Sequence, residues 1–346
     1  MNKLKTILLP AACAVILAGC AKQTSMSTGE KAQEYLSLYM STENPGVTPD
    51  KWGIYVLEDT PGTGLEWSQD APYAYLRGTI RSFGGDILSS TEESIAKQLD
   101  ENSYKSYYYY GPRYYDTSEG NGYAGLEYLL EGMRIGGKRT AILPAWLVTT
   151  SRFKTKEEYI NACTSSVHLI YDITLEGQCQ DVAGEEVDKL REYVTAHYGE
   201  SQESCTYKSD QGVGTFYFVS DTTAFKEENK RSEDATLYLT YTGRRLDGTA
   251  FDTNSEAVAL KEGLYVSEKS YEKYPVKFSS SYSSITMDGS SSLIEGFKAG
   301  LYKMHWAGQK ATVLFVSDLG YKASGSGSAI PPYCPLLFEL ELSENE

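Results

Sequence analysis

The feature that most constrains this chain is an internal repeat, because two long stretches show the same features in the same order. Each stretch opens with an expected helix, residues 29–40 in the first and residues 185–198 in the second. An alternating apolar and polar segment follows in both and ends at a turn, Gly84-Gly85 or Asp247-Gly248. Alternation that ends in such a dipeptide indicates a β-hairpin. A tandem duplication of one module explains this order better than chance.

The later parts of the two stretches also correspond. An apolar segment typical of a helix has the same spacing from its first Gly to its Met, residues 125–133 and 296–304. Each stretch then ends on an alternating strand, residues 167–175 and 336–342. The expected fold class is therefore α+β, with helices and strands in both modules.

The length of 346 residues agrees with this organisation, since it suggests about two domains. We expect a signal peptide at residues 1–19 and a lipid-anchored tether with a helix at residues 20–50. The first module should occupy residues 51–176, a linker with a helix residues 177–206, and the second module residues 207–346.

The N-terminal residues are typical of a secretory signal, because Lys3 and Lys5 precede a short apolar run at residues 6–18. The run is shorter than the roughly 20 residues that a membrane-spanning helix needs. Its end, Leu17-Ala18-Gly19-Cys20, resembles the lipobox of bacterial lipoproteins, which implies cleavage before Cys20 and attachment of lipid to it. The alternative is a plain signal peptide with an incidental cysteine.

The lipobox resemblance also implies a location. Ala21 rather than Asp follows Cys20, which favours the outer membrane under the sorting rules of Gram-negative lipoproteins. Residues 21–29 are polar and rich in Ser and Thr, as suits a flexible tether. We therefore expect a lipid-anchored protein of the cell envelope, on the outer membrane and facing the periplasm.

The net charge and the histidine content limit which partners and cofactors this chain can be expected to bind. The chain has 47 acidic and 32 basic residues, and its formal net charge is −15. No basic surface is available to displace counterions, so nucleic acid is not expected as a partner. The three histidines, His168, His197 and His305, are widely scattered, so we expect no metal site and no cofactor.

Four cysteines follow the expected signal, and their spacing matches no zinc site: Cys163, Cys179, Cys205 and Cys334. An oxidising compartment permits disulfides. A pair between Cys179 and Cys205 and a set of free buried thiols are equally good interpretations.

The second stretch carries an ordered series of motifs, and their order and spacing are more specific than any one of them. The motifs are Tyr241-Thr242-Gly243, Gly248-Thr249-Ala250-Phe251-Asp252-Thr253, Leu293-Ile294-Glu295-Gly296-Phe297, Gly320-Tyr321-Lys322-Ala323, Ala329-Ile330-Pro331-Pro332 and Leu337-Phe338-Glu339-Leu340. Over nearly all of residues 207–346 the chain resembles the FKBP-type peptidyl-prolyl isomerases. This resemblance implies a strongly bent antiparallel sheet around one short helix, with the ligand held between helix and sheet.

The resemblance also implies the site residues. Tyr241, Asp252 and Tyr321 match the positions closest to the chemistry. The expected substrate contacts are Phe251, Leu293, Ile294, Phe297, Ile330 and Phe338. Phe297 stands where the family usually has Trp, so the apolar floor is kept and the indole N–H is lost. No nucleophile or metal is needed, because an apolar pocket that strips water from the imide and favours the twisted amide lowers a barrier of about 18–20 kcal/mol.

Two departures from the family pattern bear on the site. Between Asp252 and Leu293 the chain is longer than the family norm, and this insertion could shape substrate choice or partly cover the pocket. In the first module, Leu76, Ser89, Leu126 and Thr149 replace Tyr241, Asp252, Phe297 and Tyr321. We therefore expect the first module to be a degenerate copy without isomerase activity.

The densest group of the 29 tyrosines lies in the first module at Tyr107, Tyr108, Tyr109 and Tyr110. It could form an exposed surface for a protein partner in the envelope. The plainer alternative is a strand with an adjoining loop.

Together these observations predict an anchored peptidyl-prolyl isomerase that binds proline-containing segments of exported proteins and assists their folding. The alternative is a non-catalytic peptide-binding module, or a holdase chaperone, in which both pockets only grip chains.

Overall fold

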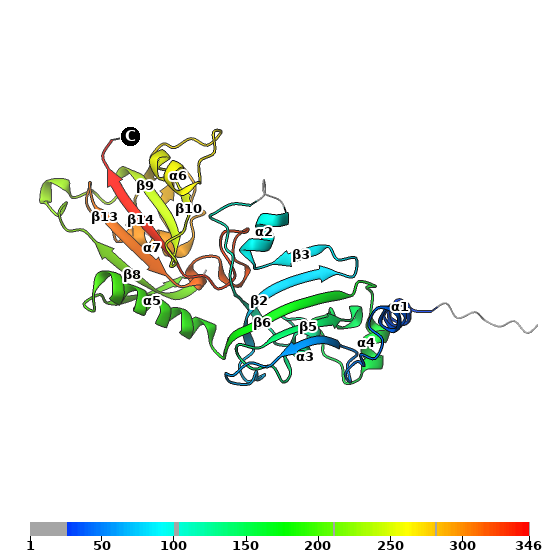
Figure 1. Ribbon diagram of the computed structural model, residues 1–346. Coiled ribbons are helices and arrows are strands. Elements are labelled where there is room, and N and C mark those ends of the chain that lie inside the picture. The colour runs from blue at the N-terminus through cyan, green and yellow to red at the C-terminus, as the bar shows by residue number, and fades with distance from the viewer. Residues whose placement is uncertain (1–25, 100–103, 210–211, 281, 346) are drawn as a thin grey trace, which may run out of the picture.

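The computed structural model of the protein describes residues 26–99, 104–209, 212–280 and 282–345 (Figure 1). The expected signal peptide and its lipid-carrying Cys20 lie outside these residues. Within the described ranges, no helix is long and apolar enough to cross a membrane.

The helices of the described residues fall at similar positions in the two halves of the chain. The α-helices are α1 (Thr28–Glu43), α2 (Glu93–Leu99), α3 (Ala124–Leu130), α4 (Lys156–Ala162), α5 (Val182–Tyr198), α6 (Glu256–Glu262) and α7 (Glu295–Tyr302). Short 3-10 turns are η1 (Ala145–Leu147), η2 (Glu227–Asn229), η3 (Tyr282–Ser284), η4 (Ser317–Leu319) and η5 (Lys322–Ser324).

Strands alternate with these helices along the chain. The first half contains β1 (Tyr55–Thr60), β2 (Tyr73–Ser82), β3 (Ile87–Ser90), β4 (Arg113–Asp116), β5 (Lys138–Leu143) and β6 (Leu169–Cys179). The second half contains β7 (Ser204–Ser209), β8 (Gly212–Ser220), β9 (Thr236–Arg245), β10 (Ala250–Thr253), β11 (Tyr274–Lys277), β12 (Thr286–Met287), β13 (Lys310–Phe315) and β14 (Leu336–Ser343).

These strands form two antiparallel sheets whose central strand orders correspond. The first sheet runs β1-β5-β6-β2, and β2 also pairs with both β3 and β4. The second runs β8-β13-β14-β9, and β9 also pairs with both β10 and β11. The second sheet additionally has β7 beside β8 and β12 beside β11. The protein is therefore a mixed α and β structure with antiparallel sheets (Figure 1).

One short helix packs on each sheet, α3 against β5 and α7 against β13. Close packing of α7 depends on its glycines. A Cβ atom at Gly300 would lie 2.7 Å from Val313 on β13, nearer than side chains normally approach. The glycine spacing of this helix therefore brings its backbone against the sheet and holds Phe297, on the same helix, in the second core.

Each half has its own apolar core, and a small third cluster joins them. The third cluster consists of Tyr114, Cys179 and Val182 with the half-buried Tyr73, Tyr75 and Tyr333. Helix α5 leaves this junction and packs on β8 and η4 of the second half (Figure 1). On its buried face Glu186 accepts a hydrogen bond from the Ser317 hydroxyl at 2.6 Å, which fixes η4.

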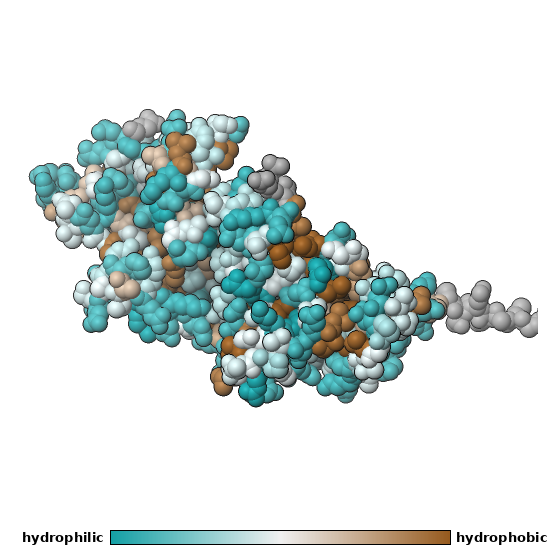
Figure 2. Space-filling model, viewed as in Figure 1, coloured by the Kyte–Doolittle hydropathy of each residue, from teal (hydrophilic) through white to brown (hydrophobic). Residues whose placement is uncertain are grey.

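The surface in view is mostly hydrophilic, as the net charge of −15 leads one to expect (Figure 2). Apolar patches lie over the first half, near β3 and α2. Leu88 and Leu99, which these two elements carry, are each 56% exposed.

Two expectations about the linker region can be compared with the structure, namely its boundaries and a disulfide. The expected boundaries at residues 176/177 and 206/207 fall inside β6 and β7, because β6 continues beyond the alternating segment at residues 167–175 and no strand was expected at residues 204–209. All four cysteines of the described residues are free, so the structure has no disulfide between Cys179 and Cys205.

Candidate functional site

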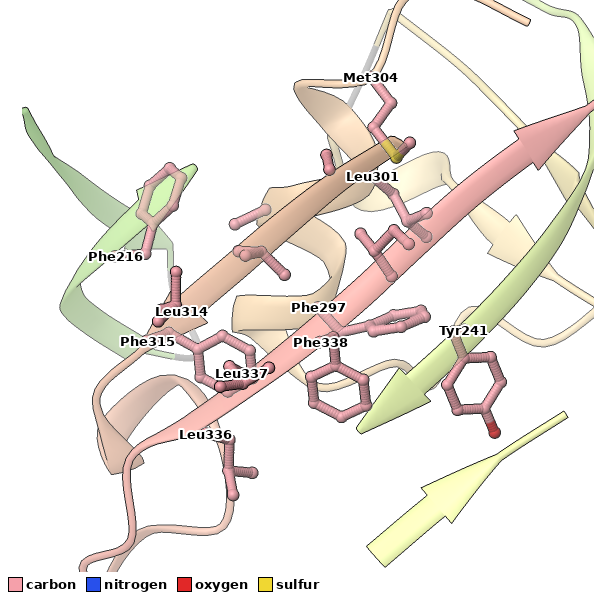
Figure 3. Packing of buried hydrophobic residues seen from close by; sticks show 14 of the residues in the cluster. Phe216, Tyr241, Phe297, Leu301, Met304, Leu314, Phe315, Leu336, Leu337 and Phe338 are labelled. Atoms are coloured by element: carbon pink, nitrogen blue, oxygen red, sulfur yellow. The ribbon is translucent and has the colours of Figure 1, made fainter. Parts of the chain in front are cut away.

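Aromatic rings from four elements of the second half meet between α7 and the sheet. Phe297 of α7 lies edge-on to Tyr241 of β9 and to Phe338 of β14, at ring separations of 5.7 and 5.0 Å. Phe251 lies edge-on to Phe338 at 5.6 Å. Figure 3 shows Tyr241, Phe297 and Phe338 side by side, with the Tyr241 hydroxyl pointing away from the other two rings. Tyr241, Phe297 and Phe338 are buried, and edge-to-face packing of this kind makes a rigid apolar cluster.

The backbone of β9 leaves room for two of these rings at Gly243. A Cβ atom there would lie 2.7 Å from both the Phe251 and the Phe338 rings. Only a residue without a side chain permits this approach. The glycine of the Tyr-Thr-Gly motif is therefore part of the site's geometry.

A phenol and a carboxylate form the polar side of the site. The Tyr241 hydroxyl donates to Asp252 Oδ2 at 2.7 Å. Burial, together with the charge of Asp252 and this hydrogen bond, raises the pKa of the Tyr241 hydroxyl above its ordinary value of 10. Tyr241 therefore stays protonated at neutral pH and acts as a fixed hydrogen-bond donor.

The insertion that follows β10 reaches this carboxylate. Lys269 Nζ lies 2.8 Å from Asp252 Oδ1 and donates to the Thr253 carbonyl at 2.9 Å. The Asp252 side chain remains 42% exposed, so the ammonium group covers it only in part. The insertion thus adds a positive charge to the edge of the site, a feature that the sequence did not reveal.

Residues 320–335, here called the pocket loop, supply the opposite wall. Tyr321 and Ile330 both pack against the second core, Tyr321 half-buried and Ile330 only 4% exposed. Burial and the nearby Asp252 raise the pKa of Tyr321. Its hydroxyl makes no hydrogen bond to the part of the chain that the structure describes, so this donor is available.

Leu293 and Ile294 bring backbone groups to the start of α7. Both side chains are partly buried against the second core. Ile294 is the N-cap residue of α7, and its carbonyl accepts from the Lys298 N–H at 3.0 Å. The N–H of Ile294 has no hydrogen-bond partner among the described residues. A free backbone donor therefore lies three residues before the Phe297 ring.

Eight of the nine residues that the sequence predicted lie in or against the second core, and the ninth, Asp252, bonds to Tyr241; the other seven are Phe251, Leu293, Ile294, Phe297, Tyr321, Ile330 and Phe338. Their roles in binding or catalysis stay predictions. The first half lacks the equivalent polar pair, since buried Leu76 stands on β2 and exposed Ser89 on β3.

Residues 104–112, here called the tyrosine loop, lie against the pocket loop. The N–H of Tyr109 donates to the Ser328 carbonyl at 2.8 Å. Arg245, which is 4% exposed, donates through Nη1 to the Tyr107 carbonyl at 2.9 Å and to the Ala329 carbonyl at 2.7 Å. The tyrosines at positions 107–110 are consequently half-buried rather than fully exposed.

Sequence reasoning missed Arg245 as well as Lys269. Arg245 is next to the hairpin turn, where a charged residue is expected to be solvated. Only its burial in the folded protein shows that it links the two loops.

Comparison with known proteins agrees with this geometry over the second half. Residues 227–343 match the sequence model of a family described as FKBP-type peptidyl-prolyl cis-trans isomerase. The FK506-binding protein of Neisseria meningitidis serogroup C is 29% identical over 119 residues, which are 34% of this chain and 85% of that protein.

Two solved structures are similar at lower identity. FkpA from Escherichia coli is 21% identical with a TM-score of 0.28, and the similarity covers 46% of this chain and 59% of that one. The three FKBP domains of wheat FKBP73 are 14% identical with a TM-score of 0.26, covering 84% of this chain and 94% of that one. In sequence, residues 227–343 are therefore similar to the FKBP type.

Proposed function

We propose that the second half of this protein is a peptidyl-prolyl cis-trans isomerase. The observation that carries the proposal is the ring surface of Tyr241, Phe297 and Phe338, with the Tyr241–Asp252 hydrogen bond at its edge. The sequence match to the FKBP-type family over residues 227–343 supports it.

An isomerase site of this kind has to lower the barrier to rotation about one X–Pro bond, and no covalent bond is made or broken. Rotation about an X–Pro bond is slow because amide resonance must be broken, and uncatalysed exchange takes tens of seconds or more. In the proposed complex the proline ring lies on Phe297, out of water. The free N–H of Ile294 and the hydroxyl of Tyr321 are donors for the flanking carbonyls. Loss of water from the imide favours the twisted, less polar amide.

We further propose that the first half is a second, degenerate module of the same kind. The shared strand order of the two sheets supports this. The absence of a phenol–carboxylate pair at Leu76 and Ser89 supports an inactive role for it.

The setting of the activity is also a proposal. The sequence at Cys20 favours a lipid anchor in the outer membrane, with the body of the protein in the periplasm. Exported polypeptides that contain proline would be its substrates there. Labelling of growing cells with a tritiated fatty acid tests this, because Cys20→Ser should remove the label.

A protease-coupled assay with a proline-containing tetrapeptide tests the isomerase itself. We expect the purified protein to accelerate cis-trans exchange. Asp252→Ala and Tyr321→Phe should each lower kcat/KM about tenfold or more, in line with the loss of one positioned polar group. Asp234→Ala, at an exposed position of the same half, is the matched control and should have no effect.

Folded protein that gives no acceleration would overturn the isomerase proposal. The holdase alternative would then be tested by suppression of aggregation of an unfolded protein, which needs grip but no catalysis.

A further inference from the structure

A cavity of about 830 Å³ lies between the two halves of the protein. Four tyrosines of the first half line it, together with Leu126: Tyr73, Tyr114, Tyr115 and Tyr123. Ala323, Pro332 and Tyr333 of the pocket loop line the opposite side. Arg113 and Asp116 contribute one charge of each sign. Tyrosine is the most frequent lining residue, at five of fourteen positions, and two of the fourteen residues are charged.

The position of this cavity in the first half corresponds to that of the candidate site in the second. Leu126 lies on α3, which packs on β5, as Phe297 lies on α7, which packs on β13. Thr149 follows β5 and η1 as Tyr321 follows β13 and η4, and the next residue, Thr150, lines the cavity. The first half has thus lost the phenol–carboxylate pair and still has a hollow at the same place.

The pocket loop connects the cavity with the candidate site. Tyr321 and Ile330 pack into the second core, whereas Ala323 and Tyr333 line the cavity. The loop is held in a fixed shape, since the Tyr333 ring lies edge-on to Tyr73 at 5.6 Å. Lys322 and Tyr333 both have a φ of 54°, a conformation that side-chain-bearing residues seldom adopt. The loop therefore has two faces, one towards the candidate site and one towards the cavity.

A tyrosine-lined hollow of this size fits one class of ligand well. Polyproline II segments dock into grooves lined by aromatic rings, because they are already extended and lose little conformational freedom on binding. Tyrosine offers such a segment both a flat apolar face and a hydroxyl for its carbonyls. The net charge of −15 disfavours nucleic acid, the other common ligand of exposed aromatic rings.

We propose that this cavity, here called the tyrosine cavity, is a second binding site that takes an extended, proline-rich segment of a polypeptide. We also infer that one long polypeptide can occupy the candidate isomerase site and the tyrosine cavity at once, on the two sides of the pocket loop. Only this part of the inference rests on the proposed function. Binding in the tyrosine cavity itself requires no isomerase activity.

Fluorescence anisotropy of a labelled octaproline peptide with the full protein tests this, with an eight-residue Gly-Ser peptide as the reference. Tyr123→Ala removes an exposed lining ring, and Ala323→Trp fills the cavity from an exposed position. Tyr35→Ala is the matched control, because Tyr35 is 53% exposed on α1 and Tyr123 is 45% exposed. We expect each cavity variant to weaken octaproline binding about tenfold, as truncation of a central aromatic contact does.

Several results would overturn the proposal: octaproline does not bind, it binds no better than the Gly-Ser peptide, or Tyr123→Ala binds it as tightly as the unmodified protein. Equal weakening by Tyr35→Ala would also overturn it. The tetrapeptide assay separates this inference from the proposed function, because Tyr123→Ala should keep full isomerase activity. Octaproline binding by a protein without isomerase activity would refute the proposed function and leave the tyrosine cavity standing.

Discussion

Arg245 should couple the stability of the protein to the shape of its candidate site. Its buried guanidinium joins the Tyr107 carbonyl of the tyrosine loop to the Ala329 carbonyl of the pocket loop, at 2.9 and 2.7 Å. The same group lies over the Tyr109 ring, 5.3 Å from its centre, and Nε donates to Asp247 at 3.1 Å. Arg245→Met keeps the length of the side chain and removes every one of these polar contacts.

The size of the effect follows from those contacts. A hydrogen bond that involves a charged group contributes about 1.5–3 kcal/mol, and two of them end on carbonyls that are only partly accessible. The Asp247 side chain is 48% exposed, so that ion pair adds little. We therefore expect Arg245→Met to lower the free energy of unfolding by about 3 kcal/mol.

Urea unfolding of the full protein, followed by far-UV circular dichroism, measures this loss. The protease-coupled isomerase assay, run where the variant is still folded, measures the second consequence. Because Ala329 precedes Ile330 of the candidate site, kcat/KM should also fall, with most of the change in KM. Arg244→Met is the matched control, since Arg244 is on the same strand and bonds to Glu262 and Glu339 instead.

The reasoning fails if Arg245→Met and Arg244→Met destabilise the protein equally. It also fails if Arg245→Met loses stability and the folded variant keeps its full kcat/KM, because Arg245 would then support the fold without shaping the pocket loop.

Three further predictions follow from the structure. Gly243→Ala should lower kcat/KM at least tenfold while the protein stays folded. The added Cβ would displace the Phe251 and Phe338 rings at a cost of about 1–3 kcal/mol. Unchanged activity would contradict the ring geometry. We expect the unmodified protein to prefer peptides with an acidic residue beside the proline over peptides with a basic one, by about fivefold in kcat/KM. Lys269→Met should abolish this preference, measured with two peptides that differ only at that residue. Lys261→Met, with a side chain 79% exposed on α6, is its control and should keep the preference.

The third prediction concerns the dependence of stability on pH. Burial lowers the pKa of His168 from 6.5 to about 4. Between these pH values the unfolded chain binds a proton at His168 and the folded chain does not. Stability should therefore be full above pH 6.5 and fall by about 3 kcal/mol towards pH 4. Urea unfolding at pH 6.5 and pH 4 measures this change, and the His168→Gln variant should lose less stability between the two pH values than the unmodified protein. If both proteins lose the same amount, His168 is not the source.

The expected elements of the second half lie close to those observed. Residues 296–304 were expected to be helical and α7 spans Glu295–Tyr302, while the strand expected at residues 336–342 is β14, Leu336–Ser343. Local periodicity is enough for this, because an apolar face with a regular spacing has one way to be buried. In contrast, β6 continues to Cys179, beyond the alternating segment at residues 167–175, and no strand was expected where β7 lies.

The candidate site was predictable for a related reason. Tyr241, Phe297 and Phe338 come from different elements, yet each stands in a motif whose order along the chain is distinctive. Lys269 gave no such signal, because the insertion has no counterpart in the family pattern and a single lysine in a charged loop looks solvated. Its contact with Asp252 depends on how the insertion folds back over β10.

The sequence alone predicted the mixed α and β class and the resemblance of the second half to the FKBP type, while the repeat and the roles of the site residues stay predictions. All of these depend on spacings within a segment or on motifs in a fixed order. The contacts between the halves became visible only in the folded protein: Arg245 bonds to Tyr107, 138 positions away, and Tyr333 packs on Tyr73. Such contacts arise from the relative placement of two separately folded cores, and no local pattern of apolar and polar residues encodes that placement.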